Sequence, residues 1–369
     1  MHPEGAASVS TPLSTLIRRA IVRDGGWLGF DRYMALALYA PGLGYYARGD
    51  RQFGRLPQDG SDFVTAPELS PYFGRALARQ IGQALSACGS AQVWEFGAGS
   101  GTLAAQLLDE LGAAVGRYAI VELSGPLRER QRARLGAHAD KVVWLDTLPD
   151  RIDGVVIGNE VLDAMPVQLL RHDGAAWHER GVALRDGCFA FADRPTALRP
   201  PGGGPFGAGY TTEIHPQAQA FVATLAERLG RGAAFFIDYG FPQAEYYHPQ
   251  RDTGTLVCHR AHRVDAEPLA DVGEKDITAH VDFTGIALAA QDAGLEVLGY
   301  TTQAHFLINC GLLGLLEGAD PASVAHAQKL LTEHEMGELF KVIGFAKDCD
   351  AAFVQAPLGF VRGDRTHTL

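Results

Sequence analysis

Three glycines at alternate positions, Gly97, Gly99 and Gly101, directly follow an apolar run in the segment "QVWEFGAGSGTL". Glycines let a ligand approach the backbone closely, so this spacing predicts a cofactor-binding loop. A dinucleotide fingerprint needs a third glycine at position 102, where Thr102 stands, and a phosphate loop needs a lysine that is absent here. The loop contains no basic residue and begins after Glu95, which favours a neutral or cationic ligand over a pyrophosphate.

A second candidate, Glu122, ends the next apolar run, 23 positions after Gly99. A carboxylate at this place in an α/β sheet accepts hydrogen bonds from the hydroxyls of a ribose. The ligand is therefore expected to contain a ribose, to contact the backbone at the glycines and to carry little negative charge. S-adenosylmethionine meets these three conditions. Two alternatives stay open: a tight glycine turn beside a surface glutamate, and a nicotinamide oxidoreductase, against which Thr102 argues.

A third group of candidates lies in "GNEVLDAMPV", where Asn159 and Glu160 end a further apolar run. Open α/β sheets bind substrates beyond the carboxyl ends of their strands, so these side chains are expected to face the transferred methyl group. Asp163 follows three residues later and would share a helical face with Glu160 on a short helix. The alternative interpretation is that Asn159 serves only to cap that helix.

Regular elements must position these candidates, and from about residue 76 the chain alternates apolar strands with helices. Four such strands separated by helices predict parallel βαβ units and thus a doubly wound α/β sheet. After residue 210 the pattern resumes with a helix, the strand "AAFFIDYG", and then helices and a closing strand. The expected strands up to that point span about 92–97, 117–123, 141–146, 153–160 and 233–240.

Three segments fall outside this alternation. Residues 1–75 are expected to form an N-terminal extension of two amphipathic helices and a long loop, 42–74, that packs as a lid. Residues 166–210 contain three short strand patterns joined by Asp-Gly turns, which predicts an antiparallel insertion. Residues 241–279 are rich in loops and are expected to serve either a dimer contact or the substrate cleft. The main domain is then expected over residues 76–369.

Composition excludes several classes of function. The formal net charge of −11 argues against a protein that binds nucleic-acid phosphates. Five scattered cysteines without a C-x-x-C motif indicate neither a disulfide framework nor a zinc module. The cluster Cys258, His259 and His262 has no carboxylate at a familiar spacing, so no metal is expected. Neither a secretory leader nor ~18 consecutive apolar residues is recognised, which predicts a cytoplasmic protein without membrane insertion.

With these motifs the whole chain resembles the MidA family of class I S-adenosylmethionine-dependent methyltransferases. This family includes a mitochondrial methyltransferase that assists the assembly of respiratory complex I. The resemblance implies a seven-stranded sheet whose last strand is antiparallel. Ser61 departs from the family pattern, which usually has glycine there. The segments that carry the resemblance are "ALYAPGLGYY", "DFVTAPELSPYFG", "EFGAGSGTLA", "GNEVLDAMPV", "IDYG", "YYHPQRDTGTL", "DITAHVDFT" and "MGELFKV".

The resemblance also assigns roles to residues. It implies that Glu122 holds the ribose of S-adenosylmethionine, that Asp146 lies beside the adenine, and that Thr65, Ala66 and Pro67 cover the cofactor. The mitochondrial relatives are implicated in methylating an arginine of a complex I subunit, so a protein acceptor of this kind is expected. The cofactor-binding residues expected on these grounds are Gly97, Ala98, Gly99, Ser100, Gly101, Glu122, Leu123, Asp146, Asn159, Thr65 and Pro67.

An arginine acceptor stays charged, because its pKa lies above ~12, and carboxylates can hold it in a bidentate manner. Glu160, Asp163 and Glu68 are therefore the expected catalytic residues. Glu68 could instead cap the helix that follows Pro71, and Asp163 could form a plain salt bridge. Two other functions stay open, an assembly or binding protein of this fold without turnover and a small-molecule methyltransferase. The oligomeric state is open as well, with a homodimer among the options.

Overall fold

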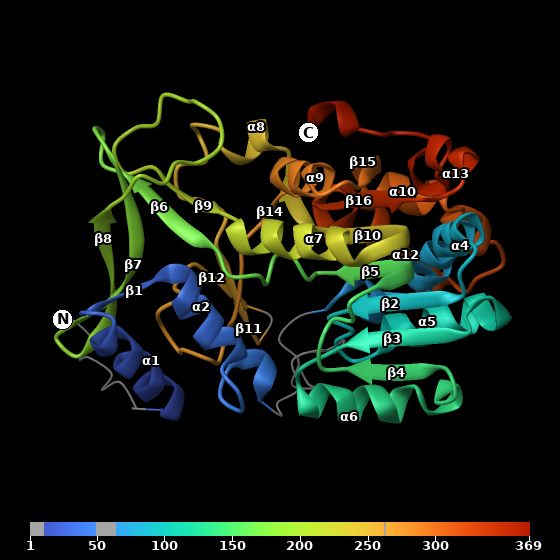
Figure 1. Cartoon of the computed structure of the whole chain (residues 1–369), viewed down its shortest axis with the longest axis horizontal. Coiled ribbons are helices and arrows are strands. Elements are labelled where there is room, and N and C mark those ends of the chain that lie inside the picture. The colour runs from blue at the N-terminus through green and yellow to red at the C-terminus, as the bar shows by residue number, and fades with distance from the viewer. Residues whose placement is uncertain (1–10, 49–63, 262) are drawn as a thin grey trace.

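A sheet of mostly parallel strands forms one lobe of the computed structural model, which describes residues 11–48, 64–261 and 263–369 (Figure 1). Its strand order is β15-β16-β10-β5-β2-β3-β4, and the short strand β14 pairs with β10. β16 runs antiparallel to both neighbours, as the family resemblance implies. The strands of this sheet are β2 Gln92–Phe96, β3 Arg117–Val121, β4 Val142–Leu145, β5 Ile152–Asn159, β10 Leu229–Phe241, β14 Val281–Asp282, β15 Glu296–Thr302 and β16 Phe340–Lys347.

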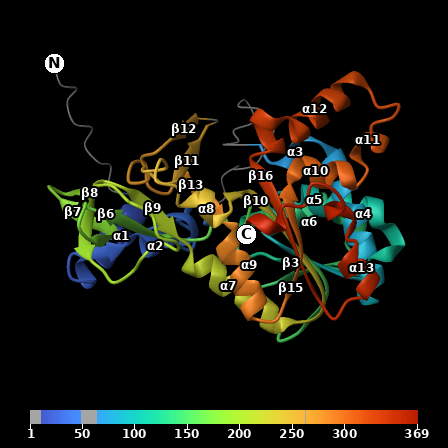
Figure 2. The same ribbon diagram turned by 90° about the horizontal axis from the view of Figure 1, so that it is seen from above.

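Helices cover both faces of this sheet, with α7 and α9 on one side and α4 and α5 on the other (Figure 2). The doubly wound α/β sheet predicted from the alternation is therefore confirmed. The α-helices are α1 Pro12–Arg23, α2 Phe30–Tyr39, α3 Ala66–Leu69, α4 Pro71–Cys88, α5 Thr102–Leu111, α6 Gly125–Arg134, α7 Pro216–Arg228, α8 Gln243–Tyr246, α9 Phe283–Asp292, α10 Gln303–Asn309, α11 Leu312–Leu315, α12 Pro321–Leu331 and α13 Ala351–Gln355. Shorter helical turns are η1 Tyr45–Ala47, η3 Gly112–Ala114, η4 Gly136–His138, η5 Glu333–Gly337, η6 Leu358–Phe360 and η7 Thr366–Thr368.

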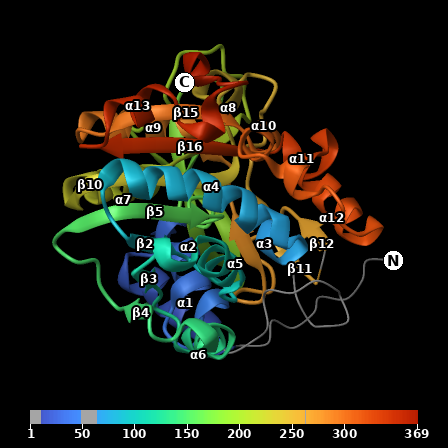
Figure 3. The same cartoon turned by 90° about the vertical axis from the view of Figure 1, so that its right-hand side faces the viewer.

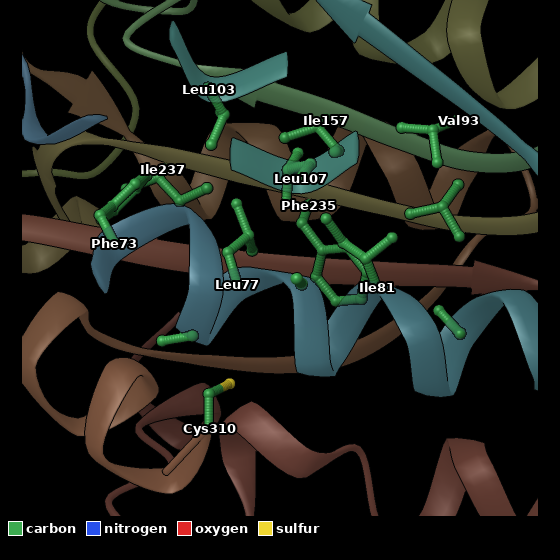
Figure 4. Close-up of a cluster of buried hydrophobic side chains, with 14 of the residues drawn as sticks. Phe73, Leu77, Ile81, Val93, Leu103, Leu107, Ile157, Phe235, Ile237 and Cys310 are labelled. Atoms are coloured by element: carbon green, nitrogen blue, oxygen red, sulfur yellow. The ribbon is translucent and has the colours of Figure 1, made fainter. Parts of the chain in front are cut away.

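Helix α4 shows why the core lies where it does. Phe73, Leu77 and Ile81 recur every four residues, so they form one apolar stripe that packs on the sheet beside α5 (Figure 4). The Ser70 hydroxyl accepts a hydrogen bond from the amide of Tyr72 and thereby caps the first turn. The helix runs through residue 75, where the end of the N-terminal extension is expected, and this domain division stays a prediction.

A five-stranded antiparallel sheet forms the core of the second lobe, with β1 of the N-terminal segment pairing with β7 of the insertion. The three strands expected in the insertion are present, and β7 meets β8 at the turn Asp186-Gly187, where both residues have positive φ. Helices α1 and α2 pack against this sheet through their buried faces (Figure 1). Its strands are β1 Trp27–Gly29, β6 Gln168–His172, β7 Trp177–Arg185, β8 Cys188–Pro195 and β9 Thr211–Ile214.

The segment expected to be loop-rich, 241–279, contains α8 and a small sheet of order β12-β11-β13. Its strands are β11 Val257–Arg260, β12 Arg263–Asp265 and β13 Asp276–Thr278. In Figure 2 this sheet lies beside the second lobe, on the side that faces the parallel sheet. In the ranges described above, no helix combines the length and the hydropathy that crossing a membrane requires.

Candidate active site

A cavity of about 810 Å³ opens between the two lobes. Part of its lining follows β5, β2 and β3, which are neighbouring strands of the parallel sheet (Figure 3). This volume lies within the range of ~300–1,000 Å³ that is common for small-molecule sites. Parallel strands bring their carboxyl ends to one edge of a sheet, and Phe96 of β2 pairs with Gly158 of β5. The glycine loop and the segment that begins at Asn159 therefore start side by side at this edge, as predicted.

The glycine loop adopts a backbone that requires glycine. Gly97, Gly99 and Gly101 have φ values of 62°, 51° and 81°, in the left-handed region that other residues avoid. A Cβ atom at Gly97 would lie 2.9 Å from Cγ2 of Val161, which would force that neighbour to move. The backbone of the loop thus faces the cavity without side chains that would fill it. Ala98 and Ser100 line the cavity with the first two glycines.

Glu68 ties the N-terminal segment to this loop. Its Oε1 atom accepts hydrogen bonds from the hydroxyls of Ser100 and Thr102, the latter at 2.6 Å. The alternative that Glu68 caps α4 is wrong, because Ser70 occupies the cap position. Thr65 and Pro67 line the cavity beside Glu68. Residues 49–63 of the expected lid, Ser61 among them, lie outside the described residues.

Glu122 follows β3 and lines the cavity with a side chain that is almost completely buried. Its Oε1 atom accepts from the amide of Ser124 at 2.8 Å, and its Oε2 atom accepts from Nε2 of Gln131 at 3.2 Å. Gln131 Nε2 also donates to the carbonyl of Gly99 at 3.0 Å, so the carboxylate and the glycine loop have a common support. Burial raises the pKa of Glu122. The next residue, Leu123, is 80% exposed and lines the cavity as well.

Asp146 follows β4 as expected, but it does not line the cavity. Its side chain is 80% exposed and forms an ion pair with Arg128 of α6. Arg128 also donates to the carbonyl of Leu145 at 2.8 Å, which holds its guanidinium at the end of β4. The ion pair with Arg128 keeps the Asp146 carboxylate out of the cavity lining, and its place beside the adenine stays a prediction.

The segment after β5 differs from the expected short helix. Glu160 has a φ of 53°, which is uncommon for a residue with a side chain, and the chain turns there. Asp238 at the end of β10 stabilises this turn, since its Oδ2 atom accepts from the amides of Val161, Leu162 and Asp163 at 2.8–3.2 Å. Glu160 and Asp163 thus do not share a helical face, yet both line the cavity because of the turn.

Glu160 lies in an acidic and desolvated part of the cavity. Its carboxylate accepts from Nδ2 of Asn159 at 3.0 Å and from the hydroxyl of Tyr239 at 3.4 Å. Burial, together with the negative charge of Asp238, raises the pKa of Glu160 to about 8. The same two causes raise the pKa of Asp163 well above its usual range. Oδ1 of Asn159 is buried and has no hydrogen-bond partner among the described residues, so it is available to a donor on a ligand.

A second wall of the cavity comes from the N-terminal segment and from the small sheet, and the sequence did not single out Tyr39 or Asp276 for it. Asp276 of β13 accepts a hydrogen bond from the hydroxyl of Tyr46 at 2.8 Å, and Tyr46 stacks on Tyr39 with ring centroids 5.5 Å apart. Tyr39, Tyr46 and Asp276 all line the cavity, as do His259 and Thr278. The sequence offered one signal for Asp276, a carboxylate within the short segment "DIT" that carries the family resemblance.

Other residues of the quoted segments and of the cysteine and histidine cluster lie elsewhere. Tyr246 and Tyr247 are buried outside the cavity and donate hydrogen bonds to Glu213 and Asp282. Cys258 is buried in the core of the second lobe. Within the described part of the chain no group of three or more His, Cys, Asp or Glu side chains could hold a metal ion. His262 of the "CHRAHR" cluster lies outside that part.

Comparison with known proteins decides the family. A family model described as "S-adenosyl-L-methionine-dependent methyltransferase" matches residues 76–301, which is more than half of the chain. The chain belongs to this family. The MidA-type methyltransferase and the cofactor S-adenosylmethionine that the motifs predicted are thereby confirmed. The fold agrees, since the structure is similar to a crystal structure of a Burkholderia thailandensis protein bound to S-adenosyl-homocysteine, with a TM-score of 0.92.

That similarity covers 99% of this methyltransferase and 100% of the other chain, at 51% identity. A native crystal structure of a protein from the same organism is similar at 49% identity, with a TM-score of 0.88 and the same coverage. More distant relatives are named protein arginine methyltransferase NDUFAF7, mitochondrial. The one from Danio rerio is 28% identical and the one from Homo sapiens 27%, over 86% and 90% of this chain and 82% of each relative.

The raised pKa values lead to a prediction for the ligand-free methyltransferase. The pKa of Glu160 is about 8 in the folded state against a usual value of 4.5, so between these values the folded state binds more protons than the unfolded state. Its contribution to stability is therefore full below pH ~4.5 and is lost as the pH rises through ~8. We expect Glu160→Gln to reduce the fall in unfolding free energy between about pH 4.5 and pH 8, as measured by urea titration.

The matched control for this measurement is Glu129→Gln, an exposed glutamate on α6. It should leave the pH dependence as in the wild type. If Glu160→Gln shows the same fall as the wild type and the control, Glu160 is not the group that titrates.

Proposed function

We propose that this methyltransferase transfers the methyl group of S-adenosylmethionine to the guanidinium group of an arginine in a protein. The resemblance given above suggests a subunit of respiratory complex I as the acceptor, and the names of the relatives support an arginine. One observation carries the proposal: the cavity is acidic, and none of the described residues that line it is an arginine or a lysine. Its acidic residues are Glu68, Glu95, Glu122, Glu160, Asp163 and Asp276.

Both reactants that meet in this cavity are cations, which explains its charge. S-adenosylmethionine supplies an electrophilic methyl group on a positively charged sulfur, and a guanidinium keeps its charge at neutral pH. Buried carboxylates without cationic partners are unfavourable, and the raised pKa values of Glu160 and Asp163 express this. A cation that enters the cavity lowers those pKa values and so binds with the release of protons.

For the cofactor we propose the glycine-loop half of the cavity. Glu122 would accept hydrogen bonds from the ribose hydroxyls, since its carboxylate is held toward the cavity by Ser124 and Gln131. The unpartnered Oδ1 of Asn159 would accept from the ammonium group of the cofactor. Gly101 does not line the cavity, and its proposed role is to shape the loop through its positive φ. The lining residues proposed to hold the cofactor are Thr65, Pro67, Gly97, Ala98, Gly99, Ser100, Glu122, Leu123 and Asn159.

Glu160 is the proposed proton acceptor. In the transfer the carbon–sulfur bond breaks and its electron pair remains on sulfur, a carbon–nitrogen bond forms, and the guanidinium nitrogen releases one proton. A carboxylate whose pKa is raised toward neutral pH is suited to accept that proton. The negative charge of Glu160 is one of the causes that raise the pKa of Asp163, so the two carboxylates lie near each other. Asp163 is proposed to help hold the guanidinium. Glu68 has a weaker claim, because it is hydrogen-bonded to the glycine loop.

The test uses S-adenosylmethionine labelled in its methyl group. The protein is incubated with lysate from cells that lack it, and the labelled material is separated into protein and small molecules. Hydrolysis of the protein fraction then shows which amino acid carries the label. Label in methylarginine is expected. Label only in small molecules would contradict the proposal in favour of a small-molecule acceptor, and no label despite cofactor binding would favour an assembly protein without turnover.

A further inference from the structure

Asp276 is a buried carboxylate on the wall of the cavity that the second lobe supplies. It begins β13, is 3% exposed, and lines the cavity with the strand neighbour Thr278. The Tyr46 hydroxyl donates to its Oδ1 atom at 2.8 Å, which fixes the orientation of the carboxylate. Ribose binding by Glu122 and proton acceptance by Glu160 do not explain why the second lobe buries an acidic side chain at this place in the cavity.

Glu160 lines the same cavity from the side of the parallel sheet, just after β5. The two groups are within electrostatic reach, because the negative charge of Asp276 raises the pKa of both Glu160 and Asp163. Each carboxylate is also held by a tyrosine hydroxyl, Tyr46 for Asp276 and Tyr239 for Glu160. The cavity therefore places one oriented carboxylate on each lobe, with the rings of these tyrosines nearby.

We propose that Asp276 and Glu160 form a two-sided clamp for the guanidinium of the acceptor arginine, in which Asp276 is the specificity-determining residue. This inference rests on the proposed function. A guanidinium is planar and presents five N–H donors in a fixed fork, so two carboxylates can hold it from two sides. An ammonium is a compact point charge without that fork, and a neutral acceptor would leave both buried carboxylates without a counter-charge.

Aromatic rings next to the clamp fit the same ligand. Tyr39 and Tyr46 are stacked with an interplanar angle of 21°, and a guanidinium plane packs well on such faces. The hydroxyl of Tyr39 donates to the carbonyl of Ala164 at 2.8 Å, which joins the N-terminal segment to the turn after β5. The second lobe thus adds an acceptor-binding wall to a sheet that binds the cofactor.

The experiment measures binding of a small acceptor analogue to the protein saturated with S-adenosylhomocysteine, so no turnover is required. The probe is N-acetyl-L-arginine methylamide, and its binding is measured by NMR titration. The neutral citrulline analogue and the lysine analogue serve as matched probes. The variants are Asp276→Asn, Tyr46→Phe and the control Asp271→Asn. The control removes a charge from the same segment, 241–279, at an exposed residue that is paired with Arg260. Affinity for S-adenosylhomocysteine is measured for each variant.

We expect the wild type to bind the arginine probe more tightly than the two other probes. Asp276→Asn should weaken the binding of the arginine probe about tenfold or more, which is the usual effect of losing a charge-assisted hydrogen bond. Tyr46→Phe should weaken it less, and Asp271→Asn not at all, with unchanged cofactor affinity throughout. Arginine binding that survives in Asp276→Asn would overturn the clamp and leave the proposed function standing. Preference of the wild type for the lysine or citrulline probe would overturn both.

Discussion

Replacing Glu160 by glutamine lowers the rate constant of methyl transfer by about 10²- to 10³-fold, the usual effect of removing a group that accepts a proton in the reaction. The dissociation constant of S-adenosylmethionine should stay within about a factor of three, because the residues proposed to bind the ribose and the loop backbone are untouched. Glutamine keeps the shape of the side chain and its contacts with Asn159 and Tyr239, so the protein should fold. Initial rates and calorimetric titration of the cofactor give the two quantities.

The control for this variant is Glu245→Gln, an exposed glutamate on α8. It changes the net charge of the protein by the same amount and should keep wild-type kinetics. A transfer rate for Glu160→Gln equal to that of the control would remove Glu160 from the reaction. A loss of cofactor affinity as large as the loss of rate would instead assign Glu160 to cofactor binding.

The second large effect is expected for Glu122→Gln, which should weaken the binding of S-adenosylmethionine by about 10- to 100-fold. The reason is that an ionised carboxylate accepts stronger hydrogen bonds from the ribose hydroxyls than an amide does. Glutamine would also turn an acceptor into a donor opposite the Ser124 amide and Nε2 of Gln131. The rate at saturating cofactor should change little, which separates this residue from Glu160. Calorimetric titration measures the affinity.

Glu129→Gln on the neighbouring helix is the matched control and should bind the cofactor as the wild type does. Equal affinities of Glu122→Gln and the control would mean that the ribose is held elsewhere. A parallel loss of affinity and of unfolding free energy would mean that Glu122 acts mainly through the contacts of Gln131 with the glycine loop.

The parts that could be predicted from the sequence depend on local pattern. Apolar runs separated by helices predicted the strands of the sheet. The alternate glycines predicted a loop whose left-handed backbone few residues other than glycine adopt. Glu122 could be placed because a residue just after a parallel strand lies at the carboxyl edge of the sheet. Two residues, Asp186 and Gly187, were likewise enough to predict the hairpin of β7 and β8.

The differences from the expected local structure come from contacts between residues far apart in the sequence. The turn at Glu160 replaces the expected helix because Asp238 of another strand accepts the amide hydrogens of residues 161 to 163. Asp146 follows its strand as expected, but Arg128 decides the direction of its side chain. Neither partner could be recognised from the local sequence.

Asp276 was missed for a related reason. It lies in a strand of three residues, which is too short to show the alternation that predicts strands. Its place in the cavity depends on the pairing of β13 with β11 and on Tyr46 from the N-terminal segment. A wall assembled from two distant segments becomes visible only in three dimensions.

The central claim is that one cavity binds the cofactor by the glycine loop and Glu122 and turns the methyl group toward Glu160. A crystal structure of this chain with S-adenosylhomocysteine tests it most directly. We predict ribose hydroxyls about 2.5–3.0 Å from the Glu122 carboxylate, with the sulfur facing the part of the cavity that Glu160, Tyr239 and Asp276 line. A ligand bound outside this cavity, or one whose sulfur faces away from Glu160, would contradict the account.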